Sequence, residues 1–423
     1  MSLQGPMVVV ADSPAPDLVD ALGAAGAFPV VESCWADAPS AFISVQPSAI
    51  VLAEPGPASD PKAADTLGLQ IQTRSGPFIP LIGRARSNAV MAIPGGLPID
   101  ADASATRLVA RLRMALRVRA LHATVLRRME TFSGQGAAMP SLPQADPIDD
   151  ATVLVTGRGR SYPTLAVAVG ERVGLIGALS VETAAKYLTA RDVNGVVIGD
   201  GFSPKVLEAL LTVMSEDARF RDLPIALASG TPALMAEFGP KLANLETAEG
   251  DPRAWIDWIL PLVRLHAFDA RLKRVMHAFD SQGMIDPQTG LLTREAFWRD
   301  LSSAMQQAAK RGVSLSVARF TFGPVLERRA SMDTARLVSR IVRNIDFACQ
   351  GSDRSILCVF TGTDLRAAHV ISRRIASALK QTMLTSEGGR PKLETCITLG
   401  TLKPTDTADT LLARVGAEAF AAN

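Results

Sequence analysis

The feature that most constrains the fold of this chain is a plan that occurs twice, in which short apolar runs end in polar turns and helical stretches separate them. In the first block these runs lie within "MVVVADSP", "PSAIVLAEPGP" and "PFIPLIGRAR". In the second block they lie within "ATVLVTGRG", "VNGVVIGDGFSP" and "DLPIALASGTP". Apolar strands that alternate with helices need crossover connections, so each block is predicted to fold around a parallel sheet.

Each block closes with a long helical stretch, "ATRLVARLRMALRVRALHATVLRRMETF" in the first and "DPRAWIDWILPLVRLHAFDARLKRVMHAF" in the second. Both contain Leu-His-Ala, starting at Leu121 and Leu265. The shared plan and ending indicate a domain-sized duplication with a period of roughly 150 residues. His122 and His266 occupy matching points, where packing or surface roles are predicted. The basic stripe on the first helix is predicted to be a solvated face or a domain contact.

Composition and charge narrow the class of protein. A chain of 423 residues suits two to four domains, and 48% hydrophobic with 20% charged residues is typical of globular proteins. The formal net charge of +2 gives no general reason to expect a nucleic-acid partner. No apolar run is long enough to span a bilayer, since the nearest is interrupted by Glu171 and Arg172, so no membrane insertion is expected.

The cysteines indicate a reducing compartment. The sequence has four of them, spaced without a C-x-x-C pair or a Cys/His cluster: Cys34, Cys349, Cys358 and Cys396. Neither a disulfide framework nor a zinc site is therefore predicted. The start of the chain lacks a basic segment and a cleavage site, so a cytoplasmic location is expected.

The third block holds the most specific string in the chain, "DPQTGLLTREAFWRDL". It resembles the Asp-x-Leu-Thr-Gly-Leu-x-Asn-Arg opening of GGDEF domains, the diguanylate cyclase family, although Gln288 and Thr293 depart from it. Further landmarks follow in the family's order: the strand "SLSVARFTF", the helix "ARLVSRIVRNID", the strand "ETCITLGTLKP" and the terminal helix "LLARVGAEAFAAN". The resemblance covers about 140 residues and implies a GGDEF-type, nucleotidyl-cyclase-like α/β domain.

The first two blocks resemble response-regulator receiver domains, in which an Asp at the end of the third strand is phosphorylated. Asp200 ends that strand in the second block, four residues before Pro204, and is the candidate phosphoacceptor. Ser229 is a candidate for the family's hydroxyl, but an acid pair after the first strand and a partner lysine are missing. In the first block Asp12 is present, and Glu54 stands where the phosphoacceptor belongs. Asp200 and Glu54 can also be plain polar residues at strand ends.

Together these resemblances imply a fold and an organisation like those of PleD-type response regulators in two-component signalling. The predicted fold is α/β, with two flavodoxin-like receiver domains followed by a GGDEF-type domain. The predicted boundaries are 1–130 for the first receiver-like domain, 131–150 for a Gly/Pro/Ser linker, 151–279 for the second receiver-like domain and 280–423 for the GGDEF domain.

The resemblance also implies that the catalytic site is degenerate. Cyclases hold metal ions and GTP with acids on the first central strand, where Arg319 and Thr321 lie here, and on the Gly-Gly-Asp/Glu-Glu-Phe turn. That signature falls on five residues of this sequence: Ser352, Asp353, Arg354, Ser355 and Ile356. Arg354 and Ser355 stand in the acidic positions, although a one-residue slip would bring Asp353 to one of them. No catalytic residue and no metal are therefore assigned.

A nucleotide-binding motif is retained next to that turn. Family members carry a product-binding Arg-x-x-Asp five residues ahead of the signature, and Arg343 and Asp346 match it here. Arg374 falls in the place of the family's second arginine, with Arg373 as its neighbour. A guanidinium can contact guanine or phosphate, and a carboxylate can accept from guanine N–H groups. The motif taken alone would be a plain surface ion pair, but its offset from the signature and the second arginine predict that Arg343, Asp346 and Arg374 bind cyclic di-GMP.

The function predicted from the sequence is a non-catalytic signalling protein, a cyclic di-GMP effector that forms a homodimer and acts on partner signalling proteins. Two alternatives remain open at this stage. One is an active, divergent diguanylate cyclase that converts two GTP molecules to cyclic di-GMP. The other is an interaction scaffold that binds no nucleotide.

Overall fold

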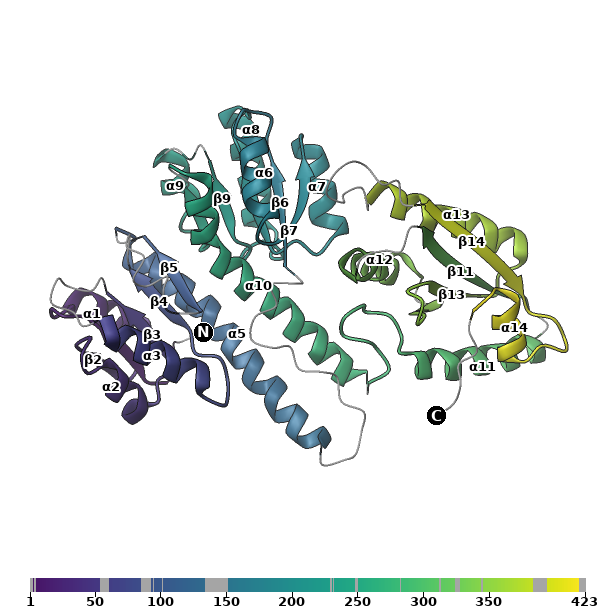
Figure 1. Cartoon of the computed structure of the whole chain (residues 1–423), viewed down its shortest axis with the longest axis horizontal. Coiled ribbons are helices and arrows are strands. Elements are labelled where there is room, and N and C mark those ends of the chain that lie inside the picture. Colours follow the sequence, from purple (N-terminus) through teal and green to yellow (C-terminus); the bar gives the residue numbers. More distant parts are fainter. Residues whose placement is uncertain are drawn as a thin grey trace. The chain divides into compact units, whose positions relative to one another are not determined.

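The computed structural model describes the chain except for residues 1, 2, 4, 54–60, 85–92, 94, 101, 134–150, 229, 231, 248–249, 282, 312, 324–327, 344, 383–393 and 418–423. Three predicted features, Glu54, Ser229 and most of the linker, lie outside the described residues. The chain forms two compact units (Figure 1). The first unit contains the residues up to 133, 151–185 and 193–272. The second unit contains residues 186–192 and the residues from 273 onward.

The first sheet of the first unit is parallel, with the strand order β2-β1-β3-β4-β5. The strands are β1 (Met7–Val10), β2 (Val30–Ser33), β3 (Ala49–Leu52), β4 (Leu81–Arg84) and β5 (Gly96–Ile99). The helices between them are α1 (Pro16–Ala24), α2 (Ala38–Val45) and α3 (Pro61–Thr73). Every residue of β1 and β3 is buried, because helices cover both faces of a parallel sheet.

The second sheet repeats this arrangement with the order β10-β9-β8-β6-β7. Its strands are β6 (Thr152–Thr156), β7 (Gly174–Ala178), β8 (Gly195–Ile198), β9 (Ile225–Leu227) and β10 (Leu245–Thr247). Its helices include α6 (Tyr162–Gly170), α7 (Val181–Ala190), α8 (Pro204–Glu216) and α9 (Pro232–Phe238). If the strands of each sheet are numbered 1 to 5 along the chain, both sheets have the order 2-1-3-4-5, which is the flavodoxin-like order. The predicted parallel α/β layers and their duplication are confirmed.

A buried ion pair joins the two sheets of the first unit. The long helices predicted to close the blocks are α5 (Ala105–Ser133) and α10 (Pro252–Asp280). On α5, Arg111 is fully buried and its Nη2 lies 2.5 Å from Glu246 Oε1 on β10. Arg111 also donates to the carbonyls of Pro98 and Ala243. The predicted basic stripe is therefore, at this position, a contact between the two halves of the unit.

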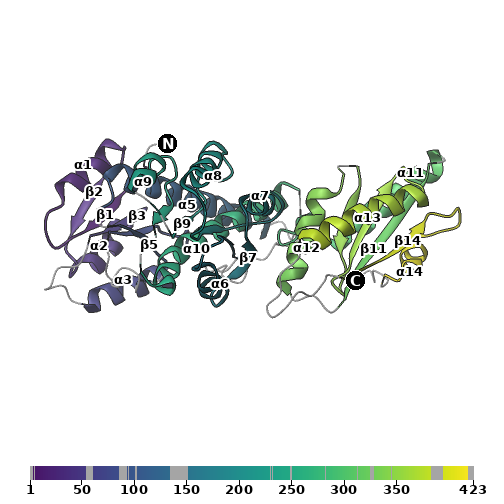
Figure 2. The same cartoon turned by 90° about the horizontal axis from the view of Figure 1, so that it is seen from above.

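The second unit is built on an antiparallel sheet of order β12-β13-β11-β14, over which α13 lies in Figure 2. Its strands are β11 (Leu315–Gly323), β12 (Phe347–Gln350), β13 (Ile356–Thr361) and β14 (Glu394–Thr401). Its helices are α11 (Arg294–Arg311), α12 (Arg328–Ile341), α13 (Leu365–Thr382) and α14 (Ala408–Arg414). Strand residues alternate between two cores, so Cys358 joins the core that includes α12 and α13, whereas Cys349 joins that of α11 and α14.

Two sequence-based expectations need correction. The helix predicted to continue to Asp346 ends at Ile341, so Arg343 and Asp346 follow it in a turn. The terminal helix predicted over 411–423 begins earlier, as α14 (Ala408–Arg414), and ends before Gly416 at φ 73°, whereas residues 418–423 lie outside the described residues. Glycine tolerates this left-handed conformation and commonly ends helices.

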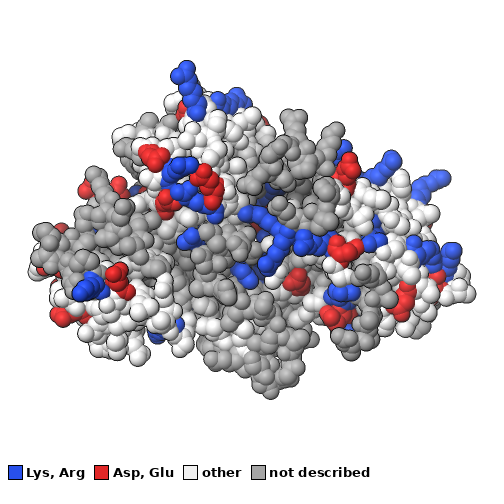
Figure 3. Space-filling model, in the orientation of Figure 1, with Lys and Arg blue, Asp and Glu red and all other residues white. Residues whose placement is uncertain are grey.

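Both signs of charge occur on the described surface of the face drawn in Figure 3. Figure 3 shows acidic and basic side chains interspersed over the described surface of one face, in keeping with the near-neutral formal charge. In the part of the chain that the structure describes, no helix combines the length and apolar character that a bilayer crossing requires.

Candidate functional site

The signature turn connects β12 to β13 in a tight hairpin. The Gly351 amide donates to the Ser355 carbonyl at 2.8 Å, and the Arg354 amide donates to the Gly351 carbonyl at 3.1 Å. These bonds enclose a three-residue loop, residues 352–354. The last residue of such a loop usually adopts a left-handed conformation. Arg354 occupies that position with φ 63°. The backbone thus closes the turn with an arginine where glycine would be the favoured residue.

An ion pair ties this turn to the central strand. Arg319 on β11 donates from Nη2 to Asp353 Oδ2 at 2.5 Å and from Nε to Ser355 Oγ at 3.3 Å. Asp353 Oδ1 in turn accepts from the amide and the hydroxyl of Ser355, at 3.0 and 2.6 Å. Burial alone would raise the pKa of Asp353, but the hydrogen bonds from Ser355 and Arg319 outweigh it, so the pKa is lowered.

The Arg319 guanidinium is enclosed on another side by the chain after α14. A Cβ added to Gly416 would lie 2.9 Å from Arg319 Nη1. The side chain of Arg319 is 18% exposed, and its charge is balanced by Asp353. Among the described residues, no three His, Cys, Asp or Glu side chains gather as a metal site would require. The carboxylate of the signature turn is thus paired with a protein cation.

The predicted nucleotide-binding residues come from two segments, the turn between α12 and β12 and the helix α13. Asp346 is 7% exposed, and its Oδ1 accepts from the amide of Thr361 at 3.0 Å and from its hydroxyl at 3.4 Å. Burial raises the pKa of Asp346, and the Thr361 hydrogen bonds and the charge of Arg343 only partly offset this. Arg343 is exposed and makes the turn in which its carbonyl accepts from the Asp346 amide at 2.9 Å.

The second predicted arginine, Arg374, lies on α13. It is exposed, as is Arg373, whereas the flanking Ser372 and Ile375 are buried. α12 and α13 pack against the same core, so the turn after α12 and the exposed side of α13 belong to one layer of the unit. The intervening Asn344 lies outside the described residues.

The string "DPQTG" forms a loop held by its own aspartate. Asp286 accepts from the amide of Gln288 at 3.0 Å and from the hydroxyl of Thr289 at 2.7 Å. This aspartate turn exposes two carbonyls to arginines. Arg274 on α10 donates to the Pro287 carbonyl at 3.1 Å, and Arg336 on α12 donates to the Gln288 carbonyl at 2.8 Å. The string therefore positions two helices.

In the first unit, Asp200 lies at the carboxyl end of β8, next to β6, where flavodoxin-like sheets bind ligands. Its carboxylate accepts from the amide of Ser161 at 3.2 Å and from the Ser161 hydroxyl. Those hydrogen bonds lower the pKa of Asp200. A Cβ on Gly159 would collide with the carboxylate, at 2.1 Å from its Cγ. The Asp200 side chain is thus engaged by the loop before α6.

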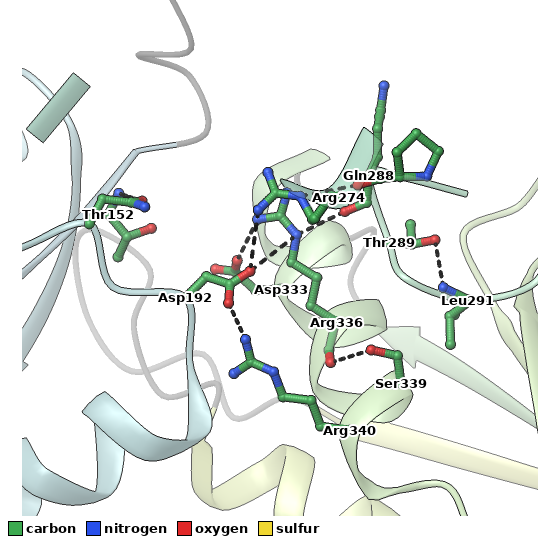
Figure 4. Close-up of polar contacts among 12 residues, drawn as sticks. Thr152, Asp192, Arg274, Gln288, Thr289, Leu291, Asp333, Arg336, Ser339 and Arg340 are labelled. Carbon is green, nitrogen blue, oxygen red and sulfur yellow. Dashed lines mark hydrogen bonds and ion pairs between the residues drawn. The ribbon is translucent and has the colours of Figure 1, made fainter. Parts of the chain in front are cut away.

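Sequence reasoning missed Asp192, which contacts three arginines of the second unit (Figure 4). An aspartate after a helix, in "TARDVNG", carries no motif and no periodic signal. The three contacts come from residues more than 80 positions away, Arg274, Arg336 and Arg340, so only the folded chain reveals them. By contrast, Arg319 and Asp353 were both identified in the sequence, though their pairing was not.

Comparisons with known proteins found similarity to solved structures only. No family model matches the sequence, and no curated protein does. Among solved structures, the coiled coil and GGDEF domain of DgcB from Caulobacter crescentus in complex with c-di-GMP is 16% identical, with 34% of this chain and 83% of that chain covered at a TM-score of 0.29. The FimX GGDEF domain from Pseudomonas aeruginosa is 17% identical, with 31% and 89% covered and a TM-score of 0.29.

A third structure is the diguanylate cyclase SiaD from Pseudomonas aeruginosa with its activator SiaC, 16% identical, with 38% of this chain and 68% of that chain covered at a TM-score of 0.29. These structural neighbours are GGDEF proteins.

Proposed function

We propose that this protein is a non-catalytic signalling protein that binds cyclic di-GMP on a degenerate GGDEF domain through Arg343, Asp346 and Arg374. Its two flavodoxin-like layers are receiver-like modules. The main support for the proposed loss of catalysis is the ion pair between Arg319 and Asp353. The retained binding function rests on the placement of the Arg-x-x-Asp motif directly before the hairpin.

The ion pair argues against metal-assisted catalysis for an electrostatic reason. A metal ion that approached Asp353 would have to displace Arg319 or to share the carboxylate with it, and two cations at one partly buried site repel each other. The Ser355 contacts use the other carboxylate oxygen. With Arg354 exposed at the tip of the turn, the described residues around the hairpin favour an anion over a magnesium ion.

Binding at the motif uses groups of different kinds. Arg343 and Arg374 are exposed and can contact phosphate or the guanine edge, whereas Asp346 is fixed by Thr361 through one oxygen. Both described hydrogen bonds to the Asp346 carboxylate use Oδ1, which leaves Oδ2 for guanine N–H groups. A carboxylate that the fold already orients costs little ordering on binding.

Calorimetric titration with cyclic di-GMP, with GTP as comparator, tests the proposal. We expect binding in the micromolar range or tighter, on the order of −8 kcal/mol, and a loss of at least tenfold in Arg343→Ala. Arg299→Ala is the control, because Arg299 is an exposed arginine on α11, which packs on the opposite core. Equal affinity of wild type and Arg343→Ala would remove the site assignment.

The enzyme alternative has a separate readout. Incubation with GTP and Mg²⁺ is expected to give no cyclic di-GMP, because Arg319 occupies the carboxylate that a metal would need. Product from the wild type that disappears in Asp353→Asn would instead identify a divergent diguanylate cyclase. Phosphorylation of Asp200 is tested by incubation with acetyl phosphate and intact-mass measurement. We expect Asp200 to stay unmodified because Ser161 donates to its carboxylate from both its amide and its hydroxyl.

A scaffold without a nucleotide is favoured by one observation in the first unit. Arg111 and Glu246 form a buried charged contact between the two parallel sheets, which joins the sheets within one unit. Absence of cyclic di-GMP binding, together with capture of a partner protein by this unit, would support that function. Homodimerisation, also proposed, is measured by light scattering.

A further inference from the structure

Asp192 is the centre of a cluster that the motif analysis does not explain. The arginine cluster consists of Arg274, Arg336 and Arg340, and Figure 4 shows all three turned toward Asp192. Arg340 Nη2 donates to Asp192 Oδ1, while Arg336 Nε and Arg274 Nη1 each lie 3.7 Å from Asp192 Oδ2. Residues 186–192 are part of the second unit, so these contacts are internal to it.

Two arginines of the cluster are held in place independently of Asp192. Arg274 and Arg336 donate to the carbonyls of Pro287 and Gln288, in the loop that Asp286 stabilises. The side chain of Arg336 is only 8% exposed, and its Nη2 has no hydrogen-bond partner among the residues that the structure describes. Fixed guanidinium groups that repel one another need a carboxylate between them, and Asp192 supplies it.

Asp192 carries its charge at neutral pH. Burial alone would raise its pKa, but Arg340, Arg336 and Arg274 outweigh that effect and lower it. The other carboxylate nearby, Asp333 on α12, has its pKa raised by burial despite the arginines around it. Asp333 also lies 3.9 Å from Arg336 Nη1, but Asp192 is the carboxylate that contacts all three arginines.

The cluster is continuous with the proposed nucleotide site along α12. Arg336 and Arg340 are four residues apart and share one side of the helix. Arg343 follows Arg340 by three residues, so the two Cα atoms are at most about 11 Å apart. This span is comparable to the distance of about 8 Å over which charges act at physiological salt. Arg340, which Asp192 contacts, is thus close enough for its charge to act on Arg343 and on a ligand held there.

We propose that Asp192 regulates the nucleotide site by partly neutralising the arginines of α12, which weakens the binding of an anionic dinucleotide at Arg343. This inference rests on the proposed function of that site. The carboxylate acts as a built-in counter-ion: while it is in place, the field at Arg343 is reduced, and when it is removed, the full charge of Arg336 and Arg340 acts on the ligand phosphates.

The test is a titration of the full chain with cyclic di-GMP at low salt and in about 0.5 M salt. Asp192→Asn is expected to bind about three- to tenfold more tightly than wild type at low salt, with the difference largely lost at high salt. Arg340→Gln, which removes a positive charge and leaves Asp192, is expected to bind more weakly. The two variants are expected to change the affinity in opposite directions, so the test remains decisive if one of them fails to fold.

Asp406→Asn is the matched control. Asp406 pairs with Arg414 in the same unit, beside α14 and on the opposite core from α12, so its loss is expected to leave the affinity unchanged. An affinity of Asp192→Asn equal to or below that of wild type, while Arg343→Ala still weakens binding at least tenfold, overturns the regulatory role alone. No binding by wild type, or undiminished binding by Arg343→Ala, overturns the proposed function and this inference with it.

Discussion

At the scale of single residues, several charged and polar groups have partners that explain their positions without catalysis. Asp200 is engaged by Ser161, Asp286 by its own loop, and Asp353 by Arg319 and Ser355. In each case the family motif predicts a functional role for the carboxylate, but in the structure the same carboxylate accepts hydrogen bonds from nearby backbone or hydroxyl groups. Such acceptors are strong because they are charged, and they order the loops that carry them.

His122 makes a pH-dependent contribution to stability. Its Nδ1 accepts from the Phe78 amide at 3.1 Å, and its ring packs edge-on against Phe268 with centroids 5.0 Å apart. Burial and then the charge of Arg119 lower its pKa. The unfolded chain therefore binds a proton at about pH 6.5 before the folded chain does, so stability is expected to fall as the pH drops below that value.

Urea unfolding between pH 5 and 8 measures this effect, and we expect a slope well below about 1.4 kcal/mol per pH unit because His122 is only half-buried. His122→Gln keeps an acceptor for the Phe78 amide but cannot titrate, so the slope below pH 6.5 should decrease. The exposed His369→Gln is the control and should follow wild type. An unchanged slope in His122→Gln would contradict the assignment.

At the scale of elements, position within the sheet decided which strands the sequence could reveal. The six predicted strands are central ones or their neighbours: β1, β3, β4, β6, β8 and β9. The four that were missed are all edge strands: β2, β5, β7 and β10. β5 is "GLPI" and β7 is "GLIGA", and glycine and proline are tolerated at edges, where a strand pairs on one side only.

The hairpin gives a prediction at this scale. Arg354 has φ 63°, a conformation that costs most L-residues about 1–2 kcal/mol but is open to glycine. Arg354→Gly is expected to raise the free energy of unfolding by about 0.5–1 kcal/mol, after the greater flexibility of glycine in the unfolded chain is counted. Ser352→Gly, in the same loop at negative φ, should lower it. A destabilised Arg354→Gly would show that the arginine side chain itself supports the turn.

At the scale of the whole molecule, the first unit depends on a charged contact between its two sheets. Burial lowers the pKa of Arg111, and the nearby charge of Glu246 opposes the shift. Glu246→Gln would leave a fully buried guanidinium without its counter-charge, which is expected to cost about 3–5 kcal/mol of unfolding free energy. Chemical denaturation measures this loss.

The control for that prediction is Asp222→Asn, which breaks the ion pair with Arg117 in the same unit. Both side chains are over 40% exposed, so the loss should be below about 1 kcal/mol. Comparable losses of unfolding free energy in the two variants would mean that another group compensates the charge of Arg111. A large loss in Glu246→Gln alone would establish the buried pair as the joint between the sheets.

The sequence by itself determined the duplication, the parallel layers and both long helices, because burial on both faces of a sheet and along a helix leaves a periodic apolar pattern. It also identified Arg343, Asp346, Asp353 and Arg319 by position. Only the tertiary structure decided that Arg319 pairs with Asp353, that Arg111 is buried against Glu246, and that Asp192 meets three arginines. Ion pairs between residues distant in the sequence leave no periodic pattern, since each partner alone looks like an ordinary surface charge.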